Sequence, residues 1–256
     1  MTETRISLPV AEKNIERGGR RDVDVERWSV HRPTGEKYEA ERYNVPRFMP
    51  FEHACFVSYR HAGPATDIVA GFCEKLAAQL ALYTNYQIFR DRKRLAPGDY
   101  LDNELATAMC RSSCMVLLFT PHYFDLDHPY CAREYQAMLE LERRRRPMLA
   151  PLQGKSLIIP VIMRGESRVP AELKASVCVS FEDRLLQTSN LRRQNVLEDV
   201  LKIAKAIHER IEAMQNVISD PAADCSSFRF PNTEDIRPWL QQIVRPPLGN
   251  PTRERL

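Results

Sequence analysis

Short runs of apolar residues alternate with amphipathic stretches between about residues 54 and 213. The apolar runs are continuous, which is typical of strands that are covered on both faces of a sheet. Pro160 lies inside one of them and favours an edge position or a bulge, because proline has no amide hydrogen for the ladder. Five runs predict buried strands: ACFVSY (54–59), YQIFRD (86–91), CMVLLFT (114–120), SLIIPVIM (156–163) and VCVSF (177–181).

The stretches between these runs carry apolar residues at helical spacing. Residues 66–83 and 196–214 each place apolar side chains on a single stripe, and helices are also expected over 100–111 and 130–146. Strands that alternate with helices predict an α/β fold, namely a flavodoxin-like five-stranded parallel sheet with helices on both faces. In that strand order the functional crevice lies at the carboxyl ends of the first and third strands.

The flanks of this regular region differ from it in composition. The N-terminal flank is highly charged with few periodic apolar positions, and the C-terminal flank is rich in proline. Neither flank has the size of an ordinary sensor domain. The chain is therefore divided into a charged N-terminal arm (1–53), an α/β domain (54–213) and a proline-rich C-terminal tail with a short helix (214–256).

The tail contains one apolar stretch, residues 236–244. Trp239, Leu240 and Ile243 would share one face of a short helix there. A helix of this length is not stable alone in water, so we expect it to dock on its own domain or on a neighbouring protein. We favour a role in assembly, in which case deleting residues 215–256 would weaken association and spare the fold.

Composition excludes several classes of function. The 37 basic and 34 acidic residues leave a net charge of +3, so electrostatically driven nucleic-acid binding is not expected. No run of about 18 apolar residues occurs, and the N-terminus is too polar for a secretory signal, which together indicate a cytoplasmic protein without a membrane span. The nine glycines form neither a GxGxxG nor a GxxxxGK[ST] motif, which excludes the usual dinucleotide and P-loop sites.

The seven cysteines are odd in number and include no CxxC pair. In the expected compartment this indicates reduced thiols that serve as small core residues, and no disulfide framework. His122, His128 and Cys131 match no zinc spacing, so no metal is expected. The four arginines at 143–146 are interpreted as closing a helix C-terminus, where cations complement the helix dipole.

Three motifs occur in order on the predicted sheet. CFVSYRH contains the first strand, FRDRKRLAPGDYLDNEL joins the second strand to a loop, and VLLFTPHYFDLDHPYCAREY contains the third strand and the start of a helix. Together, over about 54–213, they resemble the Toll/interleukin receptor (TIR) domain family, and the second motif is similar to the BB loop of that family.

The resemblance implies a bacterial-type domain that cleaves NAD. Members with this activity carry a glutamate in the third motif, here Glu134, which receptor-type domains of eukaryotes lack. The sequence departs from many members in having Tyr130 in place of tryptophan, and it lacks the serine that usually precedes this aromatic residue. The implied site consists of catalytic Glu134, of Ser58, Tyr59, Arg60, Asp91 and Tyr130 for substrate binding, and of Arg92, Leu95, Gly98 and Tyr100 in the BB loop.

The chemistry of NAD cleavage fits a single carboxylate. Nicotinamide leaves as a neutral molecule, so no general acid is needed, and the positive charge that develops on the ribose can be stabilised by Glu134. We expect Asp127 or His128 to start the helix, with Pro129 in its first turn, so that the helix dipole favours ionised Glu134. Tyr130 lies one turn earlier on the same helical face. A surface position is expected for Glu134.

Two classes of function remain open. The first is an NAD⁺ glycohydrolase that releases nicotinamide, yields ADP-ribose or a cyclic ADP-ribose, and acts as an effector or signal-producing component of bacterial antiphage defence. NAD⁺ would be its substrate, and no cofactor is expected. The second is a non-catalytic TIR scaffold or mimic that acts through TIR–TIR interactions. In either case we expect a homo-oligomer formed through TIR–TIR contacts, and a separate sensor or downstream effector protein.

Overall fold

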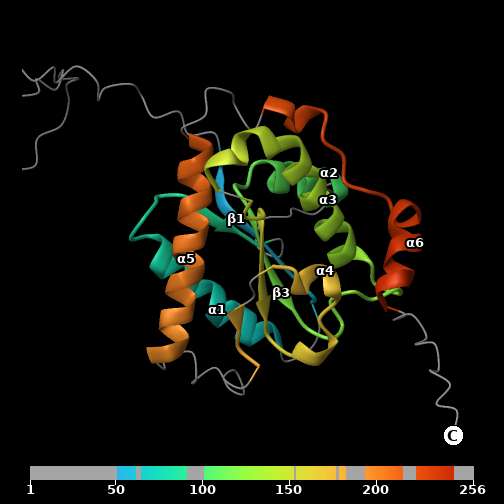
Figure 1. Ribbon diagram of the computed structural model, residues 1–256, viewed down its shortest axis with the longest axis horizontal. Helices are drawn as coiled ribbons and strands as arrows, with labels where there is room; N and C mark the ends of the chain where they lie inside the picture. The colour runs from blue at the N-terminus through green and yellow to red at the C-terminus, as the bar shows by residue number, and fades with distance from the viewer. Residues whose placement is uncertain are drawn as a thin grey trace, which may run out of the picture. The chain divides into compact units, whose positions relative to one another are not determined.

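The computed structural model describes residues 51–61, 65–90, 101–152, 154–176, 179–182, 194–215 and 223–244. These residues form a five-stranded, all-parallel sheet with the strand order β2-β1-β3-β4-β5 (Figure 1). This order confirms the flavodoxin-like α/β fold. The strands are β1 (His53–Tyr59), β2 (Gln87–Phe89), β3 (Met115–Phe119), β4 (Ile158–Ile162) and β5 (Val179–Ser180).

Helices cover both faces of the sheet. Helix α1 (Ala65–Leu80) packs against α5 (Gln194–Gln215) on one face, and α2 (Leu101–Cys110) packs against α3 (Tyr130–Arg145) on the other (Figure 1). The predicted stripe of α5 is confirmed, because the five apolar residues at helical spacing on one face are all buried: Val196, Val200, Ile203, Ile207 and Ile211. The shorter elements are η3 (Arg146–Leu152), η4 (Glu166–Arg168), α4 (Ala171–Lys174), η6 (Ala223–Ser226) and α6 (Thr233–Val244).

The three central strands are buried along their whole length. Every residue of β1, β3 and β4 is buried, as the continuous apolar runs predict for strands between two helical layers. Ser58 is the one small polar residue near the end of β1, and it pairs in register with Leu117 of β3. The Ser58 hydroxyl therefore lies on an interior strand, near the carboxyl ends of the parallel strands.

The predicted edge position of Pro160 is wrong. Strand β4 lies between β3 and β5, and Pro160 pairs in register with Leu117 of β3. Among the described residues, Val161 and Ile162 of β4 pair with β5. A proline lacks only its own amide hydrogen, so Pro160 costs this interior strand at most one hydrogen bond of a ladder.

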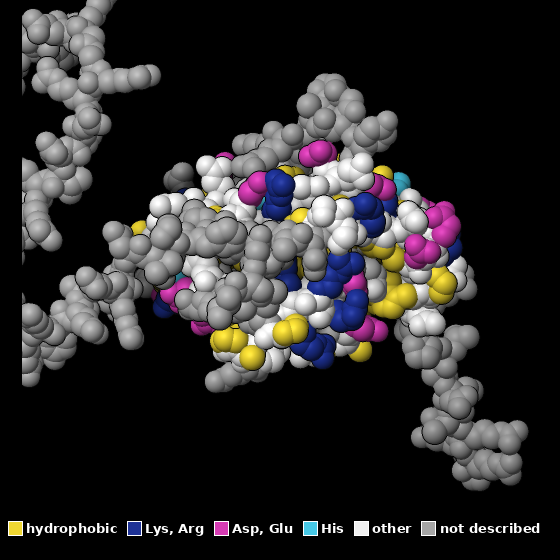
Figure 2. Space-filling view, turned by 90° about the horizontal axis from the view of Figure 1, so that it is seen from above, with side chains coloured by type: hydrophobic (Ala, Val, Ile, Leu, Met, Phe, Trp, Pro, Cys, Tyr) yellow, Lys and Arg dark blue, Asp and Glu magenta, His cyan; other side chains and the backbone are white. Residues whose placement is uncertain are grey.

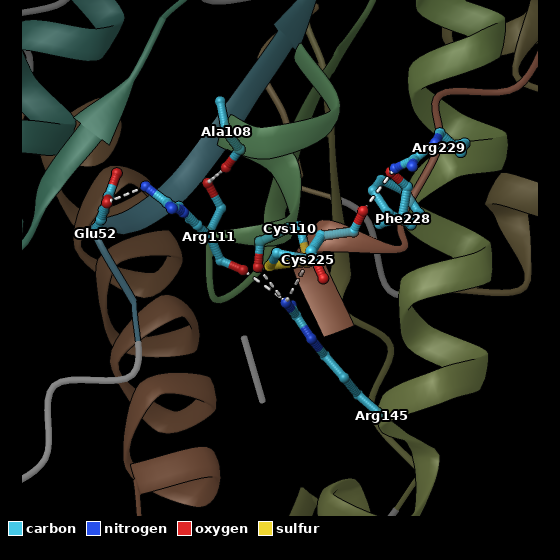
Figure 3. Close-up of a disulfide and its surroundings, with 10 residues drawn as sticks. Glu52, Ala108, Cys110, Arg111, Arg145, Cys225, Phe228 and Arg229 are labelled. Atoms are coloured by element: carbon cyan, nitrogen blue, oxygen red, sulfur yellow. Dashed lines mark hydrogen bonds and ion pairs between the residues drawn. A yellow bond between two sulfur atoms is a disulfide. The ribbon is translucent and has the colours of Figure 1, made fainter. Parts of the chain in front are cut away.

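A disulfide joins the tail to the α/β domain, which the sequence analysis did not predict. Cys110, the last residue of α2, is bonded to Cys225 of η6, with their Cα atoms 5.5 Å apart (Figure 3). The buried Arg145 reaches the same place from α3 and donates to the carbonyl oxygens of Cys110 and Ser112. The expectation of uniformly reduced thiols is wrong for this pair because 115 residues separate the two cysteines, and only the fold brings them together.

Four other described cysteines behave as predicted. Cys55, Cys73, Cys114 and Cys131 remain thiols and are buried. Burial raises the pKa of Cys73 to about 11 and also raises the pKa values of Cys55 and Cys114. These three thiols are protonated near neutral pH, so Cys55, Cys73 and Cys114 are packing groups and not reactive nucleophiles.

The short helix of the tail docks on its own domain. In α6, Trp239 stacks on Tyr135 of α3, with ring centroids 5.6 Å apart, and meets Phe124 edge-on at 5.7 Å. Ile236 and Leu240 of the same helix are buried. Of the two docking sites expected for this helix, the structure shows the intramolecular one (Figure 1). A role of the tail in assembly stays a prediction.

The surface of the described part carries both signs of charge. On the face seen in Figure 2, Lys and Arg side chains lie among Asp and Glu side chains, and the described residues form no uniformly basic area there. Among the described helices, none combines the length and the apolar character that crossing a bilayer would require. The N-terminal arm up to residue 50 lies outside the described residues.

Candidate active site

The candidate site lies where the chain order of the sheet reverses. Strand β1 has β2 on one side and β3 on the other, so the connections that follow β1 and β3 leave toward opposite faces. Crevices at the carboxyl ends of such strands are the usual ligand sites of open α/β sheets. Ser58 and Tyr59 end β1, and the loop after β3 leads into the helix that carries Glu134.

Glu134 is the fifth residue of α3. The helix starts at Tyr130, with Pro129 at the N-cap and no side-chain cap, so the expected start at Asp127 or His128 with Pro129 in the first turn is wrong. The carbonyl oxygen of Pro129 instead accepts the backbone N–H of Arg133 at 2.9 Å. Glu134 still lies in the first turns of the helix, where the positive end of the dipole favours a carboxylate.

The expected surface position of Glu134 is also wrong, because the residue is only 6% exposed. Ser58 Oγ donates to Glu134 Oε2 in a short hydrogen bond, and the hydroxyl oxygen of Tyr123 lies 2.5 Å from the same Ser58 Oγ. Tyr123 and Ser58 are 0% and 1% exposed. Three polar groups from β1, the β3–α3 loop and α3 therefore form one buried network, as burial of polar groups requires.

Tyr59 and Arg60 lie beside this network at the end of β1. The ring of buried Tyr59 packs against His61, with centroids 4.2 Å apart, and Arg60 Nη2 lies 3.7 Å from Asp125 Oδ2. Both residues line a pocket of about 60 Å³ that also includes Thr120 and Arg164. A ligand of nucleotide size needs several hundred Å³, so this pocket can hold only a fragment of one.

Tyr130 presents an exposed ring at the start of α3. Its residue is 44% exposed, and the guanidinium of Arg133 lies 5.1 Å from the centre of its ring. The same guanidinium lies 4.5 Å from the centre of the ring of Phe230 in the tail. Arg133 also donates to Asp102 Oδ2 and to the carbonyl oxygen of Pro231, both at 2.6 Å. A single buried arginine thus joins α2, α3 and the tail next to Glu134.

Arg133→Lys is expected to lower the free energy of unfolding by about 1–2 kcal/mol, because an ammonium group cannot make both fixed hydrogen bonds and the ring contacts of the guanidinium. Urea unfolding would measure this change. Arg143→Lys on the same helix is the matched control, since the Arg143 side chain is 70% exposed and the substitution should leave stability nearly unchanged. Equal urea midpoints for the two variants would contradict the structural role of Arg133.

The four arginines at 143–146 do not all interact with the end of their own helix. Arg143 and Arg144 both donate to Glu140, and these hydrogen bonds lower the pKa of Glu140 to about 2. Arg145 is buried and donates to carbonyl oxygens at the end of α2, not of its own helix. Its cationic group therefore complements the dipole of a neighbouring helix.

The structure brings together only part of the predicted site. Ser58 and Glu134 are in direct contact, Tyr59 and Arg60 lie at the adjacent strand end, and Tyr130 lies one helical turn from Glu134. In the described ranges, no group of three or more His, Cys, Asp or Glu side chains is arranged to hold a metal. Asp91 and the four predicted BB-loop residues, Arg92, Leu95, Gly98 and Tyr100, lie outside the described residues.

Two residues of the site were missed by sequence reasoning. Tyr123 lies inside the third motif. The only signal in the sequence was its hydroxyl, because a tyrosine that is buried in a loop needs a polar partner, which here is Ser58. Arg133 directly precedes Glu134, but nothing in the sequence indicates contacts with Asp102 and with a tail about 100 residues away.

Comparison with known proteins gives a family match over the segment that holds this network. Residues 55–194 match the model of the TIR domain family, a segment that contains most of β1, all of β2 to β5 and the whole Ser58–Tyr123–Glu134 network. The chain is also 26% identical over 87 residues to a Brachypodium distachyon protein named probable 2' cyclic ADP-D-ribose synthase BdTIR. That match covers 34% of this chain and 38% of the relative. The family match spans more than half of the chain, and the protein therefore belongs to the TIR domain family.

Proposed function

We propose that this TIR domain cleaves NAD⁺ between nicotinamide and ribose. The observation that carries the proposal is the Glu134 carboxylate, which Ser58 holds at the carboxyl ends of the parallel strands. A buried glutamate with a fixed orientation is unusual for a helix whose other acidic side chains lie nearer to solvent, and functional sites are where such groups collect.

The bond to be broken makes one carboxylate sufficient. Nicotinamide in NAD⁺ is a cationic pyridinium and leaves with the electron pair of the glycosidic bond, so it becomes neutral without receiving a proton. The ribose carbon develops positive charge, as in glycoside hydrolysis. Ionised Glu134 would stabilise that charge, and water or another part of the same nucleotide would then attack the carbon. Hydrolysis gives ADP-ribose, and internal attack gives a cyclic product.

The surrounding residues can bind the rest of the nucleotide. The exposed ring of Tyr130, supported by the guanidinium of Arg133, offers a stacking surface next to Glu134. Arg60 and Arg164 line the pocket at the strand ends and could meet the pyrophosphate. Because this pocket is small and Glu134 is buried, we propose that the site opens to bind NAD⁺ and is completed by a second TIR domain.

The product and the biological role belong to the same proposal. The relative from Brachypodium distachyon is named as a cyclic ADP-ribose synthase, and a cyclic ADP-ribose is therefore a candidate product alongside ADP-ribose. The chain spans less than two-fifths of that relative. From the resemblance to bacterial NAD-cleaving members, we propose a cytoplasmic effector or signal producer in antiphage defence.

The proposal is tested by incubating the purified protein at high concentration with NAD⁺ and separating the products by chromatography and mass spectrometry. Release of nicotinamide together with ADP-ribose or its cyclic isomer is the expected result. Unchanged NAD⁺ after incubation with demonstrably assembled, folded protein would contradict the enzymatic proposal.

Specific activity is expected to rise with protein concentration, because we propose that a second TIR domain opens the small pocket and the buried Glu134 to NAD⁺. The rate of nicotinamide release per molecule would be followed over a hundredfold dilution series, with light scattering on the same samples to determine their association state. A constant specific activity from a species shown to be monomeric would contradict the role of assembly.

A non-catalytic TIR scaffold is the second candidate, because the hydrogen bond between Ser58 and Glu134 would also suit a purely structural role. A glutamate that is 6% exposed and hydrogen-bonded to Ser58 could serve only to tie α3 to β1. A scaffold would bind other TIR domains equally well with glutamine at this position and would leave NAD⁺ intact. The incubation described above therefore separates the two candidates.

A further inference from the structure

Tyr123 occupies a position in the site that packing alone does not explain. It lies in the loop after β3, is 0% exposed, and its backbone N–H donates to the carbonyl oxygen of Thr120 at 2.9 Å. Its ring meets Phe124 edge-on at 4.9 Å and lies 6.3 Å from Phe119. Phenylalanine would make these ring contacts equally well, but only tyrosine brings a hydroxyl to 2.5 Å from Ser58 Oγ.

The direction of the hydrogen bonds follows from the number of protons. An ionised Glu134 only accepts, and Ser58 has a single hydroxyl proton, which it gives to Glu134 Oε2. The hydroxyl of Tyr123 must therefore donate to Ser58 Oγ. Burial raises the pKa of Tyr123 well above its usual value, and nearby Cys131 and Glu134 raise it further, so this donor keeps its proton at any working pH.

A chain of two hydrogen bonds from a fixed donor has a specific effect. Each bond polarises the next, so the Tyr123 hydroxyl strengthens the bond from Ser58 to the carboxylate. The ring of Tyr123 is fixed by its aromatic neighbours, which fixes the position of its hydroxyl oxygen and, through Ser58, of Glu134 Oε2.

We propose that Tyr123 is a positioning residue that orients the Glu134 carboxylate through Ser58. The inference rests on the proposed function in that Glu134 is taken as the catalytic group. Tyr123 itself touches no substrate. Its hydroxyl should therefore affect the rate of the chemical step and leave the binding of NAD⁺ unchanged.

The test is a double-mutant cycle on nicotinamide release. Tyr123→Phe is expected to lower kcat by about tenfold with KM unchanged, because one hydrogen bond to a charged network is lost while the ring remains. If Tyr123 acts through Ser58, Tyr123→Phe combined with Ser58→Ala should be no slower than Ser58→Ala alone. Additive losses, or a Tyr123→Phe protein with wild-type kcat, would overturn the proposal.

The matched control is Tyr135→Phe. Tyr135 belongs to the same aromatic cluster, stacks on Trp239 and is also buried, and removing its hydroxyl should leave kcat unchanged. An equal loss of kcat in this variant would mean that removing any tyrosine hydroxyl from the cluster slows the enzyme, which overturns a specific role for Tyr123.

A measurement without NAD⁺ separates this inference from the proposed function. The side-chain carboxyl carbon resonance of Glu134 is assigned by its disappearance in Glu134→Gln and then recorded in the cycle variants. It should move in Tyr123→Phe and Ser58→Ala, move no further in the double variant, and stay in place in Tyr135→Phe. If the wild-type protein leaves NAD⁺ intact but this pattern is found, the enzymatic proposal fails and the positioning role stands. An unmoved Glu134 signal in Tyr123→Phe overturns the positioning role, whatever the activity.

Discussion

Glu134→Gln is expected to reduce nicotinamide release by about 100-fold or more, because the amide removes the negative charge that stabilises the ribose cation in the transition state. The amide oxygen can still accept the hydroxyl proton of Ser58, so the buried network is kept. Rates at saturating NAD⁺ would measure the effect, and thermal unfolding would show that the fold persists.

Glutamine is a sharper substitution here than alanine. Because Glu134 is 6% exposed, alanine would leave the Ser58 hydroxyl without its acceptor and would cost about 1–3 kcal/mol of stability. A loss of activity in Glu134→Ala could then reflect local unfolding. If Glu134 were on the surface, as the sequence indicated, Glu134→Ala would change the stability only slightly.

Glu140→Gln is the control for the first prediction. Glu140 lies on the same helix with a side chain that is 35% exposed, and it is paired with Arg143 and Arg144 away from Ser58. Its replacement should leave nicotinamide release unchanged. Wild-type turnover in folded Glu134→Gln, or an equal loss in Glu140→Gln, would contradict the catalytic assignment of Glu134.

The fold could be predicted because its signals are local. The buried strands β1, β3 and β4 are continuous apolar runs, and α5 repeats its apolar residues on one face, so both follow from the period of the sequence. Pro160 misled the prediction because the rule that places proline at sheet edges is local, and it cannot show that β4 lies between β3 and β5.

The positions of the strand ends and the resemblance of the motifs predict which residues belong to the site. They do not predict the contacts between those residues. Ser58 and Glu134 are separated by 76 residues, and the topology of the sheet is what brings them into contact. The burial of Glu134 could not be predicted, because it depends on side chains from three different elements. The contacts of Arg133 and the partner of Cys110 depend on how the tail folds back, which no periodic pattern encodes.

Reduction of the disulfide between Cys110 and Cys225 is expected to destabilise the domain substantially. The bond closes a loop of 115 residues, and in the chain-entropy view releasing a loop of this size costs about 3–5 kcal/mol. For a domain of this size, that corresponds to a decrease in Tm of about 6–20 °C. The tail also buries Phe228, Ile236 and Leu240 against the domain, so deleting residues 215–256 should lower Tm further instead of sparing the fold.

The measurement compares thermal unfolding with and without a dithiol reductant. Cys225→Ser is the control, because its Tm should match that of the reduced wild-type protein and should not respond to the reductant. An unchanged Tm on reduction of the wild-type protein, with loss of the disulfide shown by mass spectrometry, would contradict the prediction.

The outcome also bears on the proposed location, since disulfides are rare in a reducing cytoplasm. If the protein acts there with both thiols reduced, the contacts of Arg133 and Trp239 must hold the tail in place without the covalent bond.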